Sequence, residues 1–332
     1  MTSAIWFMTQ GTENVSVRMQ SLSTSSSPLD QQVTVSPGQS VPFYVSSLFQ
    51  QPLGNVLTND GVRITAPSPI FVDVYLRATT DHGDFHPLIP DPLLGTEYFA
   101  AAYNRNETVT ASFILVVAQA DNTEVSLELS KLADGETIQI GGVTYDRRDT
   151  LSVTLNSLQT LQIQTASDLT GTRISSTRPV ATYSGQNRTR VVNSHTCLSH
   201  LSDQLPPVVN LGRKFVLLST PEQDVGDLYR FIAAHPFTTV VVESVPNTTI
   251  HLLSPGDFYE YDLASQSYLY SESDRPVMVV QLTKNSKYPN GTDRSGDASM
   301  GVLAPLEQAE SFYMFPQTVK LEYVYMTFVI QR

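Results

Sequence analysis

The sequence predicts an all-β chain built from tandem β-sandwich-like modules of about 100 residues. Three observations predict it: short runs of alternating polarity, turn signals between them, and an internal repeat. The strand-like runs include residues 124–129 (EVSLEL), 151–155 (LSVTL), 161–165 (LQIQT) and 238–243 (TTVVVE). Turn signals lie at residues 133–135 (ADG), 141–142 (GG), 246–247 (PN) and 255–257 (PGD). The best helix candidate, residues 302–311, is short and contains a proline, which disfavours a helix.

The repeat becomes visible when the chain is compared with itself. Residues 61–71 (GVRITAPSPIF) match 171–181 (GTRISSTRPVA) in register, and 94–99 (LGTEYF) match 211–216 (LGRKFV). The end of the unit recurs as well, because 177–183 (TRPVATY) match 274–280 (DRPVMVV). A period of about 100 residues favours separate sandwiches over a closed array of blades, which repeat at about 40 to 50 residues. The blade array stays open as the alternative.

These matches divide the chain into modules. We expect module 1 at residues 1–85, module 2 at 86–195, module 3 at 196–304 and a truncated start of module 4 at 305–332. In module 1, residues 5–8 (IWFM) take the place of an opening strand, with only a few residues before them. Module 4 stops after two expected strands, 312–315 and 325–330. The sequence is therefore expected to be a fragment, or an incomplete gene model, cut through its fourth module.

Composition and charge exclude several classes of protein. Of the 332 residues, 41% are hydrophobic and 16% charged, a balance that argues against disorder. The net charge of -12 has the wrong sign for neutralising phosphates, so we expect no nucleic-acid partner. No run approaches 18 apolar residues, and the start, MTSAIWFMTQ, lacks the basic and apolar regions of a signal peptide. We therefore expect neither membrane insertion nor an export signal within this chain.

The sequence offers no reaction centre. We find no nucleophile elbow, Ser-x-x-Lys, His-Glu-x-x-His or phosphate loop, and we expect no enzyme and no cofactor. A cleft with converging acid and base groups would instead support an enzymatic function. Residues 195–203 (HTCLSHLSD) contain metal-ligand types, but their spacing fits no compact zinc site. Residues 81–86 (DHGDFH) and 290–297 (NGTDRSGD) are interpreted as solvated loops, with metal binding as the alternative.

Two kinds of covalent modification site remain. The chain holds one cysteine, Cys197, so no disulfide can form within these residues. Cys197 is either buried or without a partner; the alternative is an intermolecular or inter-domain disulfide, because the neighbouring copies contain no cysteine. Asn-x-Ser/Thr glycosylation acceptors support secretion and occur at Asn14, Asn106, Asn187, Asn247 and Asn290.

Aromatic side chains gather in module 3. Tyr259, Tyr261, Tyr268 and Tyr270 lie at spacings of two, which places the members of each pair on one face of a strand. We interpret them as a half-buried sheet face. An exposed aromatic patch for a glycan or protein partner is the alternative.

Three ordered motifs resemble the N-terminal domain of the IgGFc-binding protein family. The first is 168–174 (DLTGTRI) with 178–180 (RPV) and 183–187 (YSGQN); the second is 199–207 (SHLSDQLPP) with 211–215 (LGRKF); the third is 296–300 (GDASM) with 304–308 (APLEQ). The resemblance covers about residues 90–332. Family members often place a cysteine directly before an Asp-His-Leu triplet, whereas here Cys197 lies two residues before Ser199-His200-Leu201.

The resemblance implies a secreted, non-enzymatic module, which in the family's vertebrate member begins a mucus protein with von Willebrand type D domains. Our first hypothesis is therefore an extracellular adhesion module that recognises a protein or a glycan, with immunoglobulin Fc or mucin as candidate partners. The second is a structural spacer within a larger secreted or mucus-type protein. Exposed aromatic side chains or a groove would favour the first hypothesis, and bland surfaces the second.

Overall fold

The fold is all-β, as the sequence predicts. The computed structural model describes residues 3–22, 28–45, 53–77, 83–104, 111–191, 198–221, 223, 225–284 and 298–311. In these ranges the only helices are four 3-10 helices of three residues each, and none has the length and hydrophobicity to cross a membrane. Residues 302–311, the best helix candidate, form no α-helix: Pro305 precedes only the three-residue 3-10 helix η5 (Leu306–Gln308), as the proline there indicates.

Module 1 contains two antiparallel sheets, ordered β4-β1-β7-β8 and β3-β2-β6. Its strands are β1 (Ser3–Met8), β2 (Val15–Ser21), β3 (Asp30–Val35), β4 (Val41–Val45), β5 (Val56–Thr58), β6 (Val62–Thr65), β7 (Phe71–Arg77) and β8 (Gly83–Pro87). β5 leaves module 1 and pairs with a strand of module 2. Module 1 therefore adds an edge strand to its neighbour.

Modules 2 and 3 follow along the chain. Module 2 holds η2 (Asp91–Leu93), β9 (Gly95–Phe99), β10 (Ser112–Ala118), β11 (Thr123–Glu128), η3 (Leu129–Lys131), β12 (Ile138–Ile140), β13 (Val143–Tyr145), β14 (Thr150–Leu155), β15 (Thr160–Thr165), β16 (Arg173–Thr189) and β17 (Ser199–Gln204). Module 3 holds η4 (Val208–Asn210), β18 (Gly212–Leu218), β19 (Asp227–Ala233), β20 (Thr238–Val242), β21 (Thr248–Leu252), β22 (Phe258–Leu263), β23 (Tyr268–Thr283) and β24 (Met300–Val302). We group β17 with module 2 because it pairs with β16.

All three modules share one topology. The strand order β14-β11-β16-β10-β15 of module 2 recurs as β21-β20-β23-β19-β22 in module 3, and the long strand also pairs with β9 and β17, or with β18 and β24. In module 1 the long strand is divided into β6 and β7, and β1 corresponds to β10 and β19. Residues 5–8 therefore belong to the second strand of the unit and not, as expected, to its opening strand. The predicted module boundaries stay a prediction.

The recurring Arg-Pro-Val motif marks the place where the long strand changes layer. The first part of β16 pairs with β11 and β9, and its second part pairs with β10 and β17. The register shifts between Ser175 and Val180, a stretch that contains Pro179. Proline has no N–H for the ladder, so the strand bends there. Pro276 lies in the corresponding shift of β23, so modules 2 and 3 each consist of two layers joined by one long strand.

The core follows from alternating polarity. In β2 the odd-numbered residues Val15, Val17 and Met19 are buried, and the residues between them face outward. β19 differs, because all seven of its residues are buried. Its inner face packs within module 3, while Leu228 and Ile232 join the core cluster of module 2. The two cores therefore touch, and modules 2 and 3 pack together directly.

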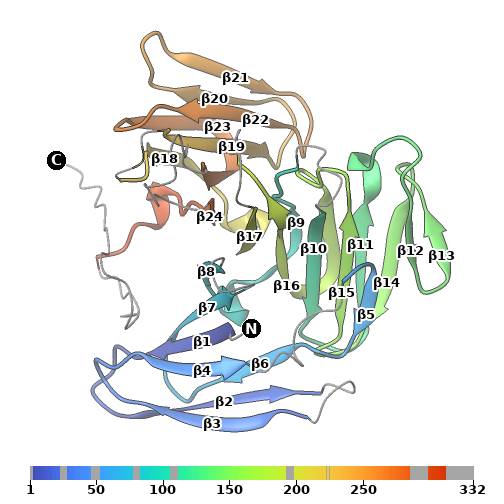
Figure 1. The fold of residues 1–332 in the computed structure, drawn as a ribbon, viewed down its shortest axis with the longest axis vertical. Coiled ribbons are helices and arrows are strands. Elements are labelled where there is room, and N and C mark those ends of the chain that lie inside the picture. The colour runs from blue at the N-terminus through green and yellow to red at the C-terminus, as the bar shows by residue number, and fades with distance from the viewer. Residues whose placement is uncertain are drawn as a thin grey trace.

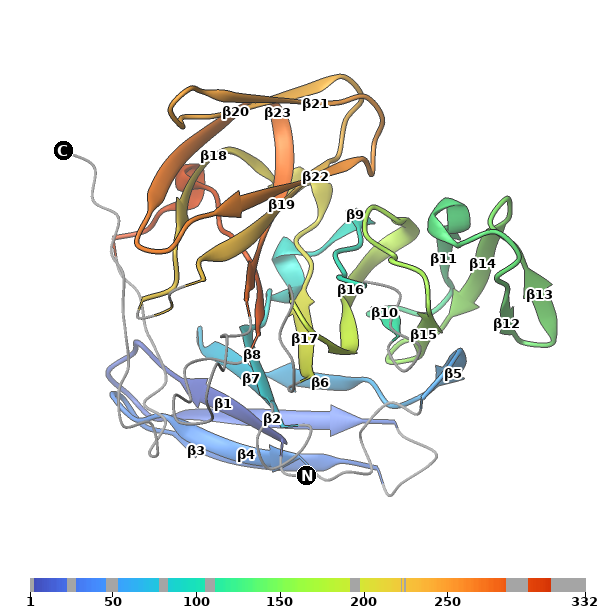
Figure 2. The ribbon, with the colours of Figure 1, turned by 45° about the horizontal axis from the view of Figure 1, so that its top comes forward.

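Figure 1 shows how the three modules are arranged, with module 1 in blue, module 2 in green and module 3 in orange. The last strand of module 2, β17, contacts β8 of module 1 and β24 of module 3. Figure 2, turned about the horizontal axis, keeps β8 and β17 side by side at the centre. The three modules thus meet around their closing strands.

Candidate functional site at the module junctions

Successive modules meet first where the 3-10 helix of one packs on the opening strand of the module before it. Pro207, before η4, lies against Gly95 of β9, and a Cβ added at Gly95 would lie 2.6 Å from the proline ring. Pro305, before η5, lies in the same way against Gly212, where the added Cβ would be 2.2 Å away. A side chain at either glycine would displace the proline, so this contact depends on glycine.

A second contact joins the loop before each long strand to a turn of the next module. The amide of Gly61 donates to the carbonyl of Leu158 over 3.1 Å. At the corresponding place in the next junction, Gly171 lies against Gly256, and a Cβ added at Gly171 would be 1.9 Å from the Gly256 carbonyl oxygen. Backbone therefore packs on backbone at both junctions.

Arg230 of β19 clamps the junction of modules 2 and 3. Its side chain is 4% exposed and lies 2.9 Å from the Asp168 carboxylate of module 2 and 2.7 Å from Glu260 of its own module. The guanidinium also stacks over the rings of Tyr103, at 4.9 Å, and Phe258, at 4.6 Å. A buried arginine with two carboxylates and two rings is fully partnered, so this contact fixes one module on the other.

Buried carboxylates join the closing strands at the centre. Asp84 of β8 accepts a hydrogen bond from the Ser202 amide of β17 over 2.6 Å. Asp203 of β17 accepts one from the Val302 amide of β24, also over 2.6 Å. Each carboxylate therefore links its strand to the next module.

Burial sets the protonation of this central group. Desolvation raises the pKa of Asp84 to about 8 and that of Asp203 to about 7, against the hydrogen bonds from backbone amides, which favour the charged forms. Desolvation lowers the pKa of His86 to about 4, so this ring is neutral at physiological pH. The ring of His86 lies 5.9 Å from that of Tyr183. Near pH 7, burial thus keeps His86 neutral and Asp84 mostly protonated, while Asp203 is close to its midpoint.

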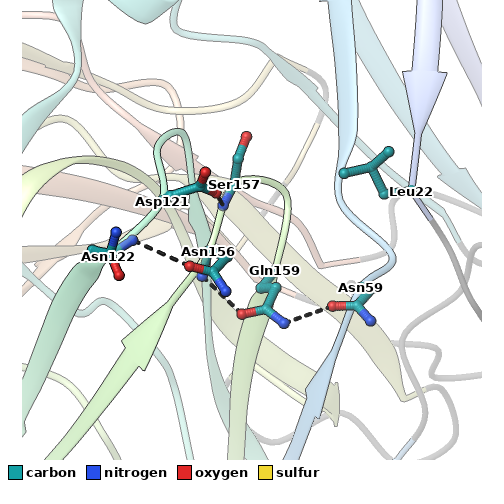
Figure 3. A pocket seen from close by; sticks show the side chains of 7 residues that line it. All are labelled: Leu22, Asn59, Asp121, Asn122, Asn156, Ser157 and Gln159. Atoms are coloured by element: carbon teal, nitrogen blue, oxygen red, sulfur yellow. Dashed lines mark hydrogen bonds between the residues drawn. The ribbon is translucent and has the colours of Figure 1, made fainter.

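Two clefts open beside these junctions. One, of about 330 Å³, lies between β8 and β24 and is lined by Tyr75, Asp84, Phe85, Gln281, Thr283, Ser299, Met300 and Gly301. The other, of about 370 Å³, lies between modules 1 and 2 and is lined by Leu22, Asn59, Asp121, Asn122, Asn156, Ser157 and Gln159. We name the second the carboxamide cleft (Figure 3). Both are large enough for a small ligand.

Hydrogen bonds hold the lining of the carboxamide cleft in place, as the dashed lines in Figure 3 show. The Gln159 side chain accepts a hydrogen bond from the backbone N–H of Asn156 over 2.7 Å and donates one to the Asn59 side chain over 2.9 Å. Asp121 accepts from the Ser157 amide over 2.9 Å, and the Asn156 side chain accepts from the Asn122 amide over 3.2 Å. The turns are therefore ordered before any ligand arrives.

Three of the predicted glycosylation acceptors lie in the described ranges. Asn14 is exposed between β1 and β2, and Asn247 is exposed between β20 and β21. Asn187, in β16, is half-buried, and its side chain accepts from the Ala111 amide over 2.7 Å. Asn106 and Asn290 lie outside the described residues. Glycosylation stays a prediction for all five.

The structure describes only some of the residues that the sequence offers for metal binding or a disulfide. Cys197 and His195 lie outside the described residues, as do residues 81–82 and 290–297. The interpretation of residues 81–86 as a solvated loop is wrong for Asp84 and His86, because both are buried in β8. His200 stacks on the ring of Phe113 at 5.9 Å, and its Nδ1 lies 3.2 Å from the Asn187 carbonyl. Across the ranges that the structure covers, no three His, Cys, Asp or Glu side chains come together as a metal site. The disulfide of Cys197 stays a prediction.

The four tyrosines of module 3 separate into two pairs. Tyr261 packs against the core of module 3, and Tyr259, on the same face of β22, is 43% exposed. Tyr268 is 76% exposed and lies on the outer face of β23 with Tyr270, since Leu269 and Ser271 between and after them turn inward. The tyrosines therefore do not gather into one patch.

Sequence reasoning missed both Arg230 and the carboxamide cleft. A single arginine in the apolar run 229–234 (YRFIAA) was the signal for the clamp, since a buried charge needs partners. The cleft residues occupy turns, where Asn, Asp and Ser are common for local reasons. Their convergence depends on the packing of modules 1 and 2, which no local pattern reports.

Comparison with known proteins gives one family. The family model described as "IgGFc binding protein" matches residues 84–332. The IgGFc-binding protein of Homo sapiens is 28% identical over 273 residues, which cover 82% of this chain and 5% of that protein. The chain thus spans a small part of the length of this relative.

One solved structure shows a faint likeness. It is the crystal structure of a tetra-tandem repeat in the extending region of a large adhesion protein. The match covers 88% of this chain and 67% of that one, with 11% sequence identity and a TM-score of 0.11. At that TM-score the likeness carries no argument about fold or function.

Proposed function

Because this chain belongs to the IgGFc-binding protein family, we propose that it is a non-catalytic, extracellular binding and adhesion module for a protein or glycan ligand. The observation that carries the proposal is the family match over residues 84–332, which spans modules 2 and 3. The name of the human relative suggests immunoglobulin G Fc as the protein ligand. A mucin-type glycoprotein is the second candidate partner.

The architecture supports a binding role. Packed junctions and the Arg230 clamp hold the modules in fixed relative positions, so turns from different modules present one preorganised surface. Exposed apolar side chains stand at the turns of module 3, with Phe237 70% and Leu253 62% exposed. Exposed apolar groups on rigid turns are typical of protein recognition surfaces.

An extracellular location is supported by the exposed acceptors. Asn14 and Asn247 both lie in exposed turns, where an attached glycan would remain in solvent. The location itself rests on the family.

A structural spacer is the competing function, and the Arg230 clamp is consistent with it as well. A buried ion pair between modules 2 and 3 gives the rigidity that a spacer needs. Under this alternative the chain would hold other domains of a longer protein apart and would bind no ligand with its own surface.

Biolayer interferometry of the full chain separates the two functions. The immobilised ligands are immunoglobulin G Fc, enzymatically deglycosylated Fc, and a mucin surface, with serum albumin as the matched negative control. Saturable binding to Fc or mucin supports the binding module. Loss of Fc binding on deglycosylation assigns recognition to the glycan. Signals equal to albumin on all surfaces overturn the proposal in favour of the spacer.

A further inference from the structure

We propose that the carboxamide cleft between modules 1 and 2 is a binding site for a neutral saccharide with neighbouring hydroxyl groups. The inference rests on the proposed function, since it names the ligand class and the place of one binding site. It starts from a comparison of the two junctions within this chain.

The turn that forms the cleft has a counterpart of the same backbone geometry in module 3. The Leu158 amide donates to Ala118 over 2.8 Å, and the Gly256 amide donates to Ala233 over 2.8 Å. The Asn156 amide is capped by Gln159 at 2.7 Å, as the Ser254 amide is capped by Asp257 at 2.8 Å. Residues 156–159 and 254–257 are therefore equivalent positions of the unit.

The neighbouring turn matches as well. Asn122 and Phe237 each follow their strand β10 or β19 by the same number of residues, and both adopt a positive φ, of 54° and 56°. Thr123 donates to Ala120 over 2.7 Å, as Thr238 donates to His235 over 2.8 Å. The two junctions can thus be compared position by position.

The comparison shows that the fold does not need four of the polar side chains of the cleft. Asp121, Asn122, Ser157 and Asn59 correspond to Pro236, Phe237, Pro255 and Leu169 at the second junction. None of these four replacements has a side-chain hydrogen-bonding group. Leu169 is fully buried, so the second junction is packed where the first stays open.

Several groups in the cleft remain available for a ligand. In the described part of the chain, the Asn122 side chain, Nδ2 of Asn156 and the second carboxylate oxygen of Asp121 make no hydrogen bond, and all three residues are exposed. They offer donors and acceptors a short distance apart. Vicinal hydroxyls of a sugar ring, each both donor and acceptor, match such a set.

The charge and shape of the carboxamide cleft restrict the class of ligand further. Asp121 is the one charged residue of the lining. A lining whose only charge is a carboxylate gives no advantage to an anion. Leu22, 61% exposed, supplies an apolar wall for the C–H face of a ring. The volume of about 370 Å³ has room for roughly one or two sugar rings.

Ligand-observed NMR of the full chain tests the site. The probes are methyl α-mannopyranoside, galactose and N-acetylglucosamine as neutral sugars, with N-acetylneuraminic acid as the anionic comparison. The test variant combines Asn122→Gly, which keeps the positive φ, with Asn156→Ser, the residue found at the equivalent position 254. The matched control is Ser254→Ala in the equivalent turn of module 3.

We expect a saturable binding signal for at least one neutral sugar. The affinity should be about tenfold weaker in the double variant and unchanged in the control, and all three proteins should have equal melting temperatures. Binding of N-acetylneuraminic acid alone, equal binding by the double variant, or no binding of any neutral sugar overturns the site. Fc and mucin binding, measured on the same samples, separates the two proposals. Retained Fc or mucin binding without sugar binding refutes only the cleft.

Discussion

Arg230 and Asp168 form a 2.9 Å ion pair across the junction of modules 2 and 3, with the guanidinium almost fully buried. Because removing water from a guanidinium is costly, such a pair persists only where further partners compensate. Here the Ala102 carbonyl accepts a second hydrogen bond over 2.5 Å, and Glu260 a third over 2.7 Å. Packing of the two modules is thus coupled to one side chain.

Substitution of Arg230 by methionine should lower the free energy of unfolding by about 2 to 4 kcal/mol, because it leaves Asp168 and Glu260 without their cation. The matched control is Arg173→Met, whose side chain is 44% exposed beside Glu97 and Glu128. That change should cost less than about 1 kcal/mol. Chemical denaturation measures both, and equal losses in the two variants would contradict the clamp.

Gly171→Ala tests the backbone contact between the same modules. Its φ of +81° disfavours any side chain, and the new Cβ would lie 1.9 Å from the Gly256 carbonyl oxygen. Gly135 has the same φ of +81° but no atom within 4 Å of an added Cβ. Alanine should cost about 1 kcal/mol at Gly135 and at least about 3 kcal/mol at Gly171. Equal denaturation midpoints for Gly171→Ala and Gly135→Ala would show that the contact between Gly171 and Gly256 accommodates a side chain at little cost.

Much of the fold could be predicted from the sequence, because strands and repeats leave local patterns. The match of residues 61–71 with 171–181 correctly aligned β6 with the start of β16, and Pro69 lies between β6 and β7 where Pro179 lies within β16. The assignment of residues 5–8 to the opening strand was wrong because an aromatic apolar run fits the first and the second strand equally well. Only pairing of β1 with both β4 and β7 decides between them.

The candidate site was less predictable. Asn59 and Gln159 are far apart in sequence, and their 2.9 Å hydrogen bond exists because module 1 packs on module 2. Turn chemistry explains each Asn or Asp separately, so nothing local marks them as a group. Arg230 is visible in the sequence within an apolar strand, but two of its partners, Asp168 and Tyr103, come from another module.

The central carboxylates predict a loss of stability with rising pH. The pKa of Asp84 is raised to about 8 and that of Asp203 to about 7, from 3.8 in each case. At pH values between 3.8 and the raised pKa, each of these two carboxyl groups holds more protons in the folded chain than in the unfolded chain. Stability therefore falls as pH rises through the folded pKa. His86, lowered from 6.5 to about 4, acts oppositely but only below its unfolded value.

The clean window therefore lies between pH 6.5 and 8, where the free energy of unfolding should fall by about 2 kcal/mol through Asp84 and Asp203. Asp84→Asn removes one of the two groups and should flatten the slope. Denaturant titrations at several pH values measure it. A slope that is unchanged in Asp84→Asn, or stability that rises across this window, would contradict neutral carboxyl groups at the centre.

Phe237 predicts a stabilising substitution. It is 70% exposed and adopts a φ of 56°, which is unfavourable for a bulky side chain, whereas the equivalent position in module 2 is Asn122. Phe237→Asn should raise the free energy of unfolding by about 0.5 to 1 kcal/mol. Phe237→Ala is the control, because it removes apolar surface but keeps the backbone cost. A melting temperature of Phe237→Asn no higher than that of Phe237→Ala would refute the prediction.

The proposed binding role is tested most directly by titrating the full chain against immobilised immunoglobulin G Fc and mucin, with Gly171→Ala measured in parallel. We predict saturable binding to at least one ligand, weakened in Gly171→Ala if the recognition surface spans modules 2 and 3. Binding no stronger than to serum albumin on either surface would contradict the binding module and leave the spacer.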